Sequence, residues 1–360
     1  MKKDTLELLR ELTEVNGVPG FESRVAAIMC DHLESIADEC CTDNLGSLIA
    51  RLDGASDRPR VMLAGHMDEI GFMVKLVTED GFVQFAPLGG WWDQVLLAQR
   101  VTIETAKGPI TGVIGSKPPH LLPEEERSKV VKRKDMFIDV AAKDRDEATK
   151  EFGIRPGDPI VPVMPFEVMQ NEDRLLAKGW DDRIGVALAI ETLQAFDGKD
   201  HPNTLYAVGT VQEEVGLRGA ETAADVVHPD VALVLETGIA GDVPGISDTE
   251  SNVKLGGGVA IYVLEGSAIP NLRLRDLAID ICEERGLDYQ LTVLERGGTD
   301  AGRIHLHDRG VPSLAIGVPT RHIHTHAGII SAKDYETTLK LVIELCKALD
   351  EDTVEDMKSC

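Results

Sequence analysis

Short apolar runs alternate with helix-length amphipathic segments along much of this chain, and this rhythm most limits its possible folds. The run 60–65 is apolar and ends at His66, as expected of a buried central strand. Further elements follow in order, with helices predicted at 182–193, 219–224, 271–284 and 331–349, and strands at 205–211, 231–235, 259–264, 289–294 and 313–318. Such a series predicts an open α/β sheet, whose ligands bind where the strands end.

The chain is too long for one ordinary core. Its 360 residues exceed the roughly 250 to 300 at which chains divide into domains. Helices are predicted at 6–15 and 22–36, but between 70 and 168 short alternating strands, turns and Pro or Gly breaks predominate. We therefore predict a catalytic domain of residues 1–69 and 169–360, interrupted by a β-rich insert of residues 70–168.

Charge and composition exclude several classes of partner. The 62 acidic residues outnumber the 37 basic ones, and the formal net charge of -25 would repel nucleic acid. No segment approaches the roughly 20 apolar residues of a membrane span, and no signal-peptide pattern precedes the first helix. The six cysteines lack Cys-x-x-Cys spacing and are expected to be free thiols in a reducing cytoplasm. We expect the acidic tail 349–356 to be frayed.

Histidines and carboxylates stand where predicted strands end or a helix begins. The candidates are His66, Asp68, Asp181, Glu213, Glu214, Glu236 and His324. Because strand ends of an open α/β sheet meet at one edge, we expect these side chains to converge. Two histidines and three carboxylates, one of them shared, give each of two divalent ions three protein ligands and leave room for a bridging water. A further Glu beside that water is a general base, so the pattern predicts a hydrolytic site.

Some candidates have a plainer interpretation. Asp181 and Asp182 precede a helix and suit its cap, although Asp181, one step outside the helix, is the better candidate for a shared ligand. His322, His324 and His326 recur at every second position and would share one face of an extended chain. Spacing alone therefore does not choose among the three imidazoles.

Other interpretations also stay open. The string 297–302 either lines a substrate pocket or caps a helix, and His120 in the insert is expected to be structural or to contact a neighbouring subunit. Two of the acids alone would suit a glycoside hydrolase of the endoglucanase type. A non-catalytic metal-binding assembly protein is the other alternative.

The strings resemble those of the tetrahedral and glutamyl aminopeptidase family of dinuclear metallopeptidases, peptidase family forty-two, whose members are also called deblocking aminopeptidase or cellulase. The resemblance spans nearly the whole chain. It rests on GHMDEIG at 65–71, WDDRIG at 180–185, VQEEVG at 211–216, GTDA at 298–301 and PTRHIH at 319–324. The insert falls between the first two ligand strings, as in this family and unlike the related dinuclear carboxypeptidases.

The resemblance also implies a set of metal ligands. One ion would take His66 and Glu236 and the other Glu214 and His324, while Asp181 bridges the two. Zinc is the expected metal, with cobalt or manganese as alternatives, because this set of oxygen and nitrogen ligands accepts several divalent ions.

Two further residues receive roles by the same resemblance. Glu213 would be the general base, and Asp68 would orient His66. The chain departs from the family pattern at His322, where members often carry Tyr, and at Glu236, where many carry Asp.

The fold and activity implied by the resemblance are specific. They are a mixed sheet sandwiched by helices with an inserted, barrel-like dimerisation domain, and a metal-dependent aminopeptidase in which a bridging hydroxide cleaves the first residue from short peptides. Members assemble from dimers into a hollow dodecamer, so we expect a cytoplasmic homo-oligomer. Which amino-terminal residue is preferred does not follow from the strings.

Overall fold

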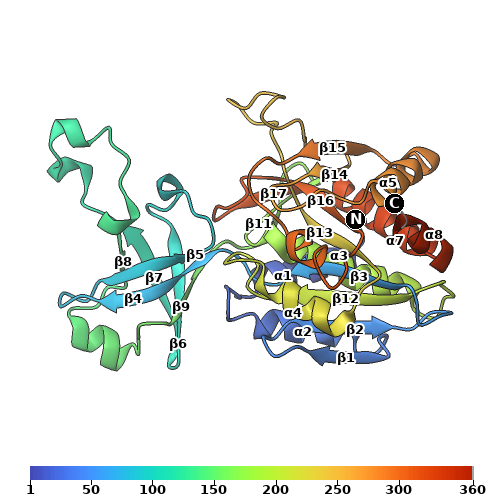
Figure 1. Cartoon of the computed structure of the whole chain (residues 1–360). Helices are drawn as coiled ribbons and strands as arrows, with labels where there is room; N and C mark the ends of the chain where they lie inside the picture. The colour runs from blue at the N-terminus through green and yellow to red at the C-terminus, as the bar shows by residue number, and fades with distance from the viewer. Residues whose placement is uncertain (359–360) are drawn as a thin grey trace.

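The computed structural model describes residues 1–358, and both the α/β sheet and the β-rich insert are present in it (Figure 1). An 11-stranded mixed sheet lies between helices, and a closed barrel stands beside it. The predicted fold class is therefore confirmed. The five cysteines within the described residues are free thiols, whereas Cys360 lies outside them. None of the described helices is long and apolar enough to cross a membrane.

Four parallel strands form the centre of the large sheet. The strands of the whole sheet are β1 (Glu39–Thr42), β2 (Leu48–Leu52), β3 (Arg60–His66), β10 (Glu167–Val168), β11 (Arg174–Ala177), β12 (Thr204–Thr210), β13 (Val231–Ile239), β14 (Val259–Leu264), β15 (Tyr289–Val293), β16 (Ser313–Arg321) and β17 (Gly328–Ser331). Their order is β1-β2-β12-β3-β13-β16-β17-β11-β10, with β14 beside β16 and β15 beside β14. Because β12, β3, β13 and β16 are mutually parallel, their carboxyl ends meet at one edge.

Helices cover both faces of this sheet because its central strands are apolar on both sides. In β3, Val61 and Leu63 join one core cluster, whereas Met62 and Ala64 join the other. The first face carries α1 (Lys3–Glu14), α2 (Ser23–Leu33), α3 (Trp180–Phe196), α5 (Leu272–Arg285), α7 (Ala332–Ala348) and α8 (Glu351–Lys358). The second face carries α4 (Arg218–Val227) and α6 (Ala301–Ile304).

The expectation of a frayed acidic tail is wrong. Residues 351–358 form α8, whose Val354 and Met357 are buried against the core at 1% and 6% exposure. Asp350 accepts a hydrogen bond from the backbone N–H of Thr353 at 2.9 Å and so caps the helix. Two apolar residues three positions apart place one face of α8 on the core, and its acids face solvent.

The barrel is closed and has its own core. Its strands are β4 (Gly71–Val77), β5 (Val83–Leu88), β6 (Arg100–Thr105), β7 (Gly108–Gly115), β8 (Phe137–Asp139) and β9 (Pro159–Pro162), in the order β4-β5-β8-β7-β6-β9. Short helical turns at Asp93–Val95, Pro119–Leu121, Glu124–Glu126, Arg133–Asp135 and Glu147–Glu151 connect them. Phe72, Phe85 and Trp91 are among the side chains that fill the interior. Closure leaves the barrel without a free edge strand.

Candidate active site

The carboxyl edge of the four parallel strands carries the predicted site residues. His66 is the last residue of β3, and Glu213 and Glu214 lie in the turn that follows β12. His324 lies three residues after β16, whereas Glu236 stands within β13, opposite Gly317 of β16. The expectation that Glu236 follows its strand is therefore wrong, because β13 continues to Ile239. The buried Glu236 carboxylate nevertheless lies beside His66 at the carboxyl edge of the sheet.

Asp181 and Asp182 begin α3 with non-helical backbone angles and a cis peptide bond between them. The Asp182 carboxylate accepts the backbone N–H of Gly185 at 3.0 Å, so it caps the helix as predicted. It also accepts the backbone N–H of His66 at 3.0 Å. Asp182 therefore ties β3 to α3, and Asp181 is left to face the site.

Asp181 lies between the two predicted histidine ligands. Its Oδ1 is 3.1 Å from His66 Nε2, and its Oδ2 is 3.3 Å from His324 Nε2. Glu213 Oε2 lies 3.8 Å from His66 Nε2, and Glu214 Oε1 lies 3.6 Å from His324 Nε2. The two adjacent glutamates therefore face different imidazoles.

Two groups of side chains have possible ligand atoms within 4.8 Å of one another. They are His66 with Glu213 and Glu236, and His66 with Asp181 and Glu214. The structure therefore brings all the predicted ligands to one place. It differs from the implied pairing in two respects. Glu213 lies as near the first group as a ligand would, and the second group holds His66 in place of His324, whose Nε2 lies 3.3 Å from Asp181 and 3.6 Å from Glu214.

Asp68 contacts the site through two different parts of the residue. Its carbonyl oxygen lies 3.0 Å from His66 Nδ1, whereas its carboxylate oxygen is 3.6 Å away. The carboxylate instead accepts the backbone N–H groups of Glu213 at 3.0 Å and Glu214 at 3.1 Å. The main-chain carbonyl is therefore the nearer partner of the His66 ring, with the carboxylate beyond it. Asp68 fixes the turn that carries both glutamates.

The carboxylates at the site outnumber its two imidazoles, and burial changes the pKa values of these carboxylates. Burial raises the pKa of Glu213 and of Glu236 well above the ordinary value, and burial together with the Asp181 charge raises the pKa of Glu214 to about 8. Burial opposes ionisation of Asp181 too, but hydrogen bonds from both imidazoles outweigh it and hold its pKa well below the ordinary value. Glu214 Oε1 is buried and has no hydrogen-bond partner. Such a site is incomplete without added positive charge.

We expect the metal-free protein to lose stability as the pH rises from about 5 to about 10. The pKa of Glu214 is raised to about 8 and that of His324 to about 10, where the Asp181 and Glu214 carboxylates outweigh burial. The folded state therefore holds these protons more tightly than the unfolded chain, and the stabilisation is lost as the pH rises through the folded-state pKa values. Asp181, with its lowered pKa, acts only at acidic pH. Thermal melting of chelator-treated protein measures this.

A Glu214→Gln variant is the control for that pH series, because it removes one of the titrating groups. Its melting temperature should fall less between the same pH values. An unchanged slope in this variant, or a rising melting temperature in the wild type, would contradict the predicted linkage.

The structure also distinguishes among the remaining candidates, which are Asp300 and the three alternate histidines. Asp300 precedes α6 but its side chain caps nothing, and it accepts the Thr210 hydroxyl hydrogen bond instead. His322 and His324 have left-handed backbone angles, φ of 62° and 56°, so the three alternate histidines do not share one face. His326 is buried, with its ring 5.1 Å from that of Trp91. Because of these backbone angles, His324 is the one of the three imidazoles that reaches Asp181.

Sequence reasoning missed one contact to the site. His324 Nδ1 lies 2.7 Å from the carbonyl oxygen of Gly90, in the insert. The only signal was the paired glycine before two tryptophans, which by itself indicates a turn.

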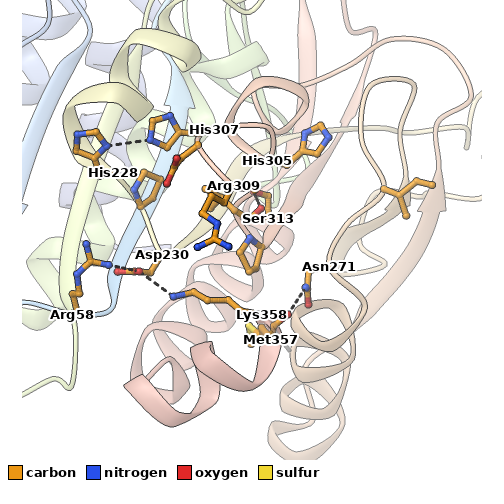
Figure 2. Close-up of a pocket in the computed structure, with 16 residues that line it drawn as sticks. Arg58, His228, Asp230, Asn271, His305, His307, Arg309, Ser313, Met357 and Lys358 are labelled. Carbon is orange, nitrogen blue, oxygen red and sulfur yellow. Dashed lines mark hydrogen bonds and ion pairs between the residues drawn. The ribbon is translucent and has the colours of Figure 1, made fainter. Parts of the chain in front are cut away.

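A separate cavity of about 800 Å³ lies at the opposite ends of the same strands (Figure 2). Ser313, which begins β16, and Asp230, which precedes β13, line it. Figure 2 shows His228 and His307 facing one another, and His228 Nδ1 lies 3.2 Å from His307 Nε2. None of the predicted site residues lines this cavity. The candidate active site is therefore the carboxyl edge and not this cavity.

Comparison with known sequences identifies a family. The profile described as M42 glutamyl aminopeptidase matches residues 46–341, and one described as AMPT matches residues 3–29. The chain is 41% identical to FrvX of Escherichia coli strain K12 over 94% of this chain and 93% of that protein. It is 32% identical to the glutamyl aminopeptidase of Lactococcus lactis over 99% of each chain.

Solved structures agree with these matches. A TET aminopeptidase from Thaumarchaeota archaeon SCGC AB-539-E09 superposes with a TM-score of 0.96 at 49% identity, covering 98% of this chain and 99% of that one. PhTET1, solved as a dodecamer, superposes with a TM-score of 0.85 at 31% identity over 97% of this chain and 100% of that one. A Thermotoga maritima protein named endoglucanase matches at 0.78 and 28% identity, over 98% and 99%. The chain thus belongs to the M42 glutamyl aminopeptidase family and is a hydrolase of peptide bonds.

Proposed function

We propose that this chain is a two-metal aminopeptidase that removes the amino-terminal residue from short peptides. The observation that carries the proposal is the position of Asp181, whose two carboxylate oxygens face two different imidazoles at 3.1 and 3.3 Å. A carboxylate in that position suits a ligand shared by two ions. Family membership supports the peptidase activity, and the metal count and chemistry are inferred from the side chains.

The side chains fit two divalent cations. His66 and Glu236 would hold one ion, Glu214 and His324 the other, and Asp181 both. The buried Glu214 Oε1 that lacks a partner would gain one, and the raised pKa values of the glutamates would fall once cations stand beside them. When bound, the ions, most simply zinc with cobalt or manganese as alternatives, would polarise the scissile carbonyl and acidify a water molecule.

Glu213 is the residue that we assign to proton transfer. The residue is 9% exposed, and its backbone N–H donates to the Asp68 carboxylate. Burial raises its pKa, which favours accepting a proton from the attacking water and then donating it to the leaving amine. Glu213 and Glu214 face different imidazoles, which is compatible with different chemical roles for the two residues.

We also propose that the chain assembles from dimers into a dodecamer, with the barrel as the dimerisation domain. The dodecameric PhTET1 relative supports this assembly. Multi-angle light scattering should give the mass of twelve chains, and a monomer would contradict it. The free cysteines within the described residues suit a reducing cytoplasm, where we place the protein.

A glycoside hydrolase is the second candidate, favoured by the endoglucanase name of one structural relative. Two carboxylates can cleave a glycosidic bond without metal. Here, however, the carboxylates meet two imidazoles, which that chemistry does not require.

Removal of metal should abolish peptide cleavage. We expect chelator-treated protein to lose release of the first residue from a short peptide with a free amino terminus, and added zinc, cobalt or manganese to restore it. Mass spectrometry of the products measures this, with the amino-terminally acetylated peptide as the matched control that should stay intact. Cleavage of a β-glucan after chelation, with none of the peptide, would support the glycoside hydrolase instead.

A further inference from the structure

A loop of the barrel reaches the candidate metal site. Residues 89–92, which we call the diglycine loop, follow β5 directly. Leu88 of β5 pairs with Gly71 of β4, five positions after His66, so the loop begins where the chain enters the barrel from the site (Figure 1). We propose that this loop completes the active site, with Gly90 as a positioning residue for the ligand His324.

The Gly90 carbonyl determines which nitrogen of His324 faces the metal site. It lies 2.7 Å from Nδ1, so Nδ1–H donates to it and Nε2 is the nitrogen left to bind a metal ion. Nε2 is the nitrogen that faces Asp181 at 3.3 Å and Glu214 at 3.6 Å. A metal-binding histidine commonly donates its other ring N–H to a carbonyl or carboxylate, which fixes the ring and its tautomer. For His324 that partner comes from the inserted barrel.

Both glycines of the loop make room for ligands. A Cβ atom at Gly90 would stand 3.0 Å from His324 Nδ1 and 3.3 Å from its Cε1. A Cβ atom at Gly89 would stand 2.9 Å from Glu214 Oε2 and 2.5 Å from Ile70 Cγ2, and the Gly89 backbone has φ of +86°. The two side chains crowded in this way are the proposed ligands of one ion, so the loop packs on that half of the site.

Trp91 anchors the loop on both sides. Its ring is buried and stacks on Phe72 of the barrel core at 4.7 Å, and its Nε1–H donates to the Gly71 carbonyl at 3.0 Å. On the other side it lies 5.1 Å from the His326 ring, in the turn that carries His324. That turn has left-handed backbone angles, which are costly for residues other than glycine and need support from their surroundings. The barrel supplies this support, so it holds one metal ligand in addition to any role in assembly.

The inference rests on the proposed two-ion site, and Co²⁺ is the probe that tests it. We expect Gly90→Ala to weaken binding of one of two Co²⁺ ions by about 10- to 100-fold and to alter the visible Co²⁺ spectrum, while the other ion binds normally. Chelator-treated protein is titrated with Co²⁺ and followed by calorimetry and absorption. His324→Ala gives the reference for complete loss of that step.

Gly115→Ala is the matched control, because a Cβ atom there is crowded to the same degree, 3.1 and 3.3 Å from the Phe137 ring, but lies in β7 of the barrel. It should bind both ions as the wild type does. Trp91→Phe, which keeps the stacking and removes the hydrogen bond to Gly71, should weaken the same step. If Gly90→Ala melts at a much lower temperature than the wild type, Trp91→Phe serves as the test variant in its place.

The outcomes separate the inference from the proposed function. Normal binding of two ions by Gly90→Ala or by Trp91→Phe would overturn the positioning role, as would equal loss in Gly115→Ala. A wild type that binds a single ion would instead overturn the two-ion site itself. The expected pattern is two ions in the wild type and in Gly115→Ala, with one weakened step in the two loop variants.

Discussion

Replacement of Glu213 by Gln should lower kcat by about 10²- to 10⁴-fold, the usual contribution of a general base. The amide has nearly the same shape as the carboxylate but cannot accept a proton from water. In this site the carboxylate is nearly buried, burial raises its pKa, and its backbone is fixed by Asp68. The protein should therefore remain folded and lose only the proton transfer. Initial rates on a short peptide measure the effect.

Metal content separates the two roles that the structure allows for Glu213. Its carboxylate groups with His66 and Glu236 as closely as a ligand would, so loss of one ion from Glu213→Gln would make it a ligand and not the base. Retention of both ions with lost turnover supports the base. Glu221→Gln, at an exposed position of α4, is the matched control and should have normal kcat. Near-normal turnover in Glu213→Gln would remove the residue from the mechanism.

The local pattern of apolar and polar residues was sufficient to predict most of the central strands of the sheet. The predicted strand 259–264 coincides with β14, and the strands that end near His66 and Glu213 are parallel as the βαβ series requires. Convergence of His66, the two adjacent glutamates and His324 followed from this, because parallel strands end at one edge, whereas Asp181 reaches the site from the start of α3. The histidine and carboxylates were therefore predictable as a group without any knowledge of their contacts.

Contacts between segments that are distant in the sequence could not be predicted from the local sequence pattern. The Asp68 carboxylate meets a turn 145 and 146 positions away, and His324 meets a carbonyl 234 positions away. Neither partner is distinguished by its own sequence neighbourhood, since backbone N–H and carbonyl groups occur at nearly every residue. The helix α8 was missed for another reason, because its acids masked two apolar residues at helical spacing.

Replacement of Asp181 by Asn should have the largest effect on metal binding. The carboxylate presents one oxygen to each histidine, and the amide would present an NH₂ group in place of one oxygen, which cannot bind a cation. We expect the affinity for both ions to fall by more than about 100-fold, beyond the loss typical of residues that only support a ligand. Peptide hydrolysis should fall to background with it. Co²⁺ titration and initial rates measure the two effects.

The number of binding steps affected decides whether Asp181 is shared. Asp181→Asn should weaken both steps of the Co²⁺ titration, whereas His324→Ala should weaken one, because among the described carboxylates Nε2 of that imidazole meets those of Asp181 and Glu214. Asp197→Asn, at the exposed carboxyl end of the same helix, is the matched control and should change neither step. Loss of a single step in Asp181→Asn would make Asp181 a ligand of one ion. The second ion would then need another bridging group, and no other carboxylate among the described residues faces both imidazoles within 3.5 Å.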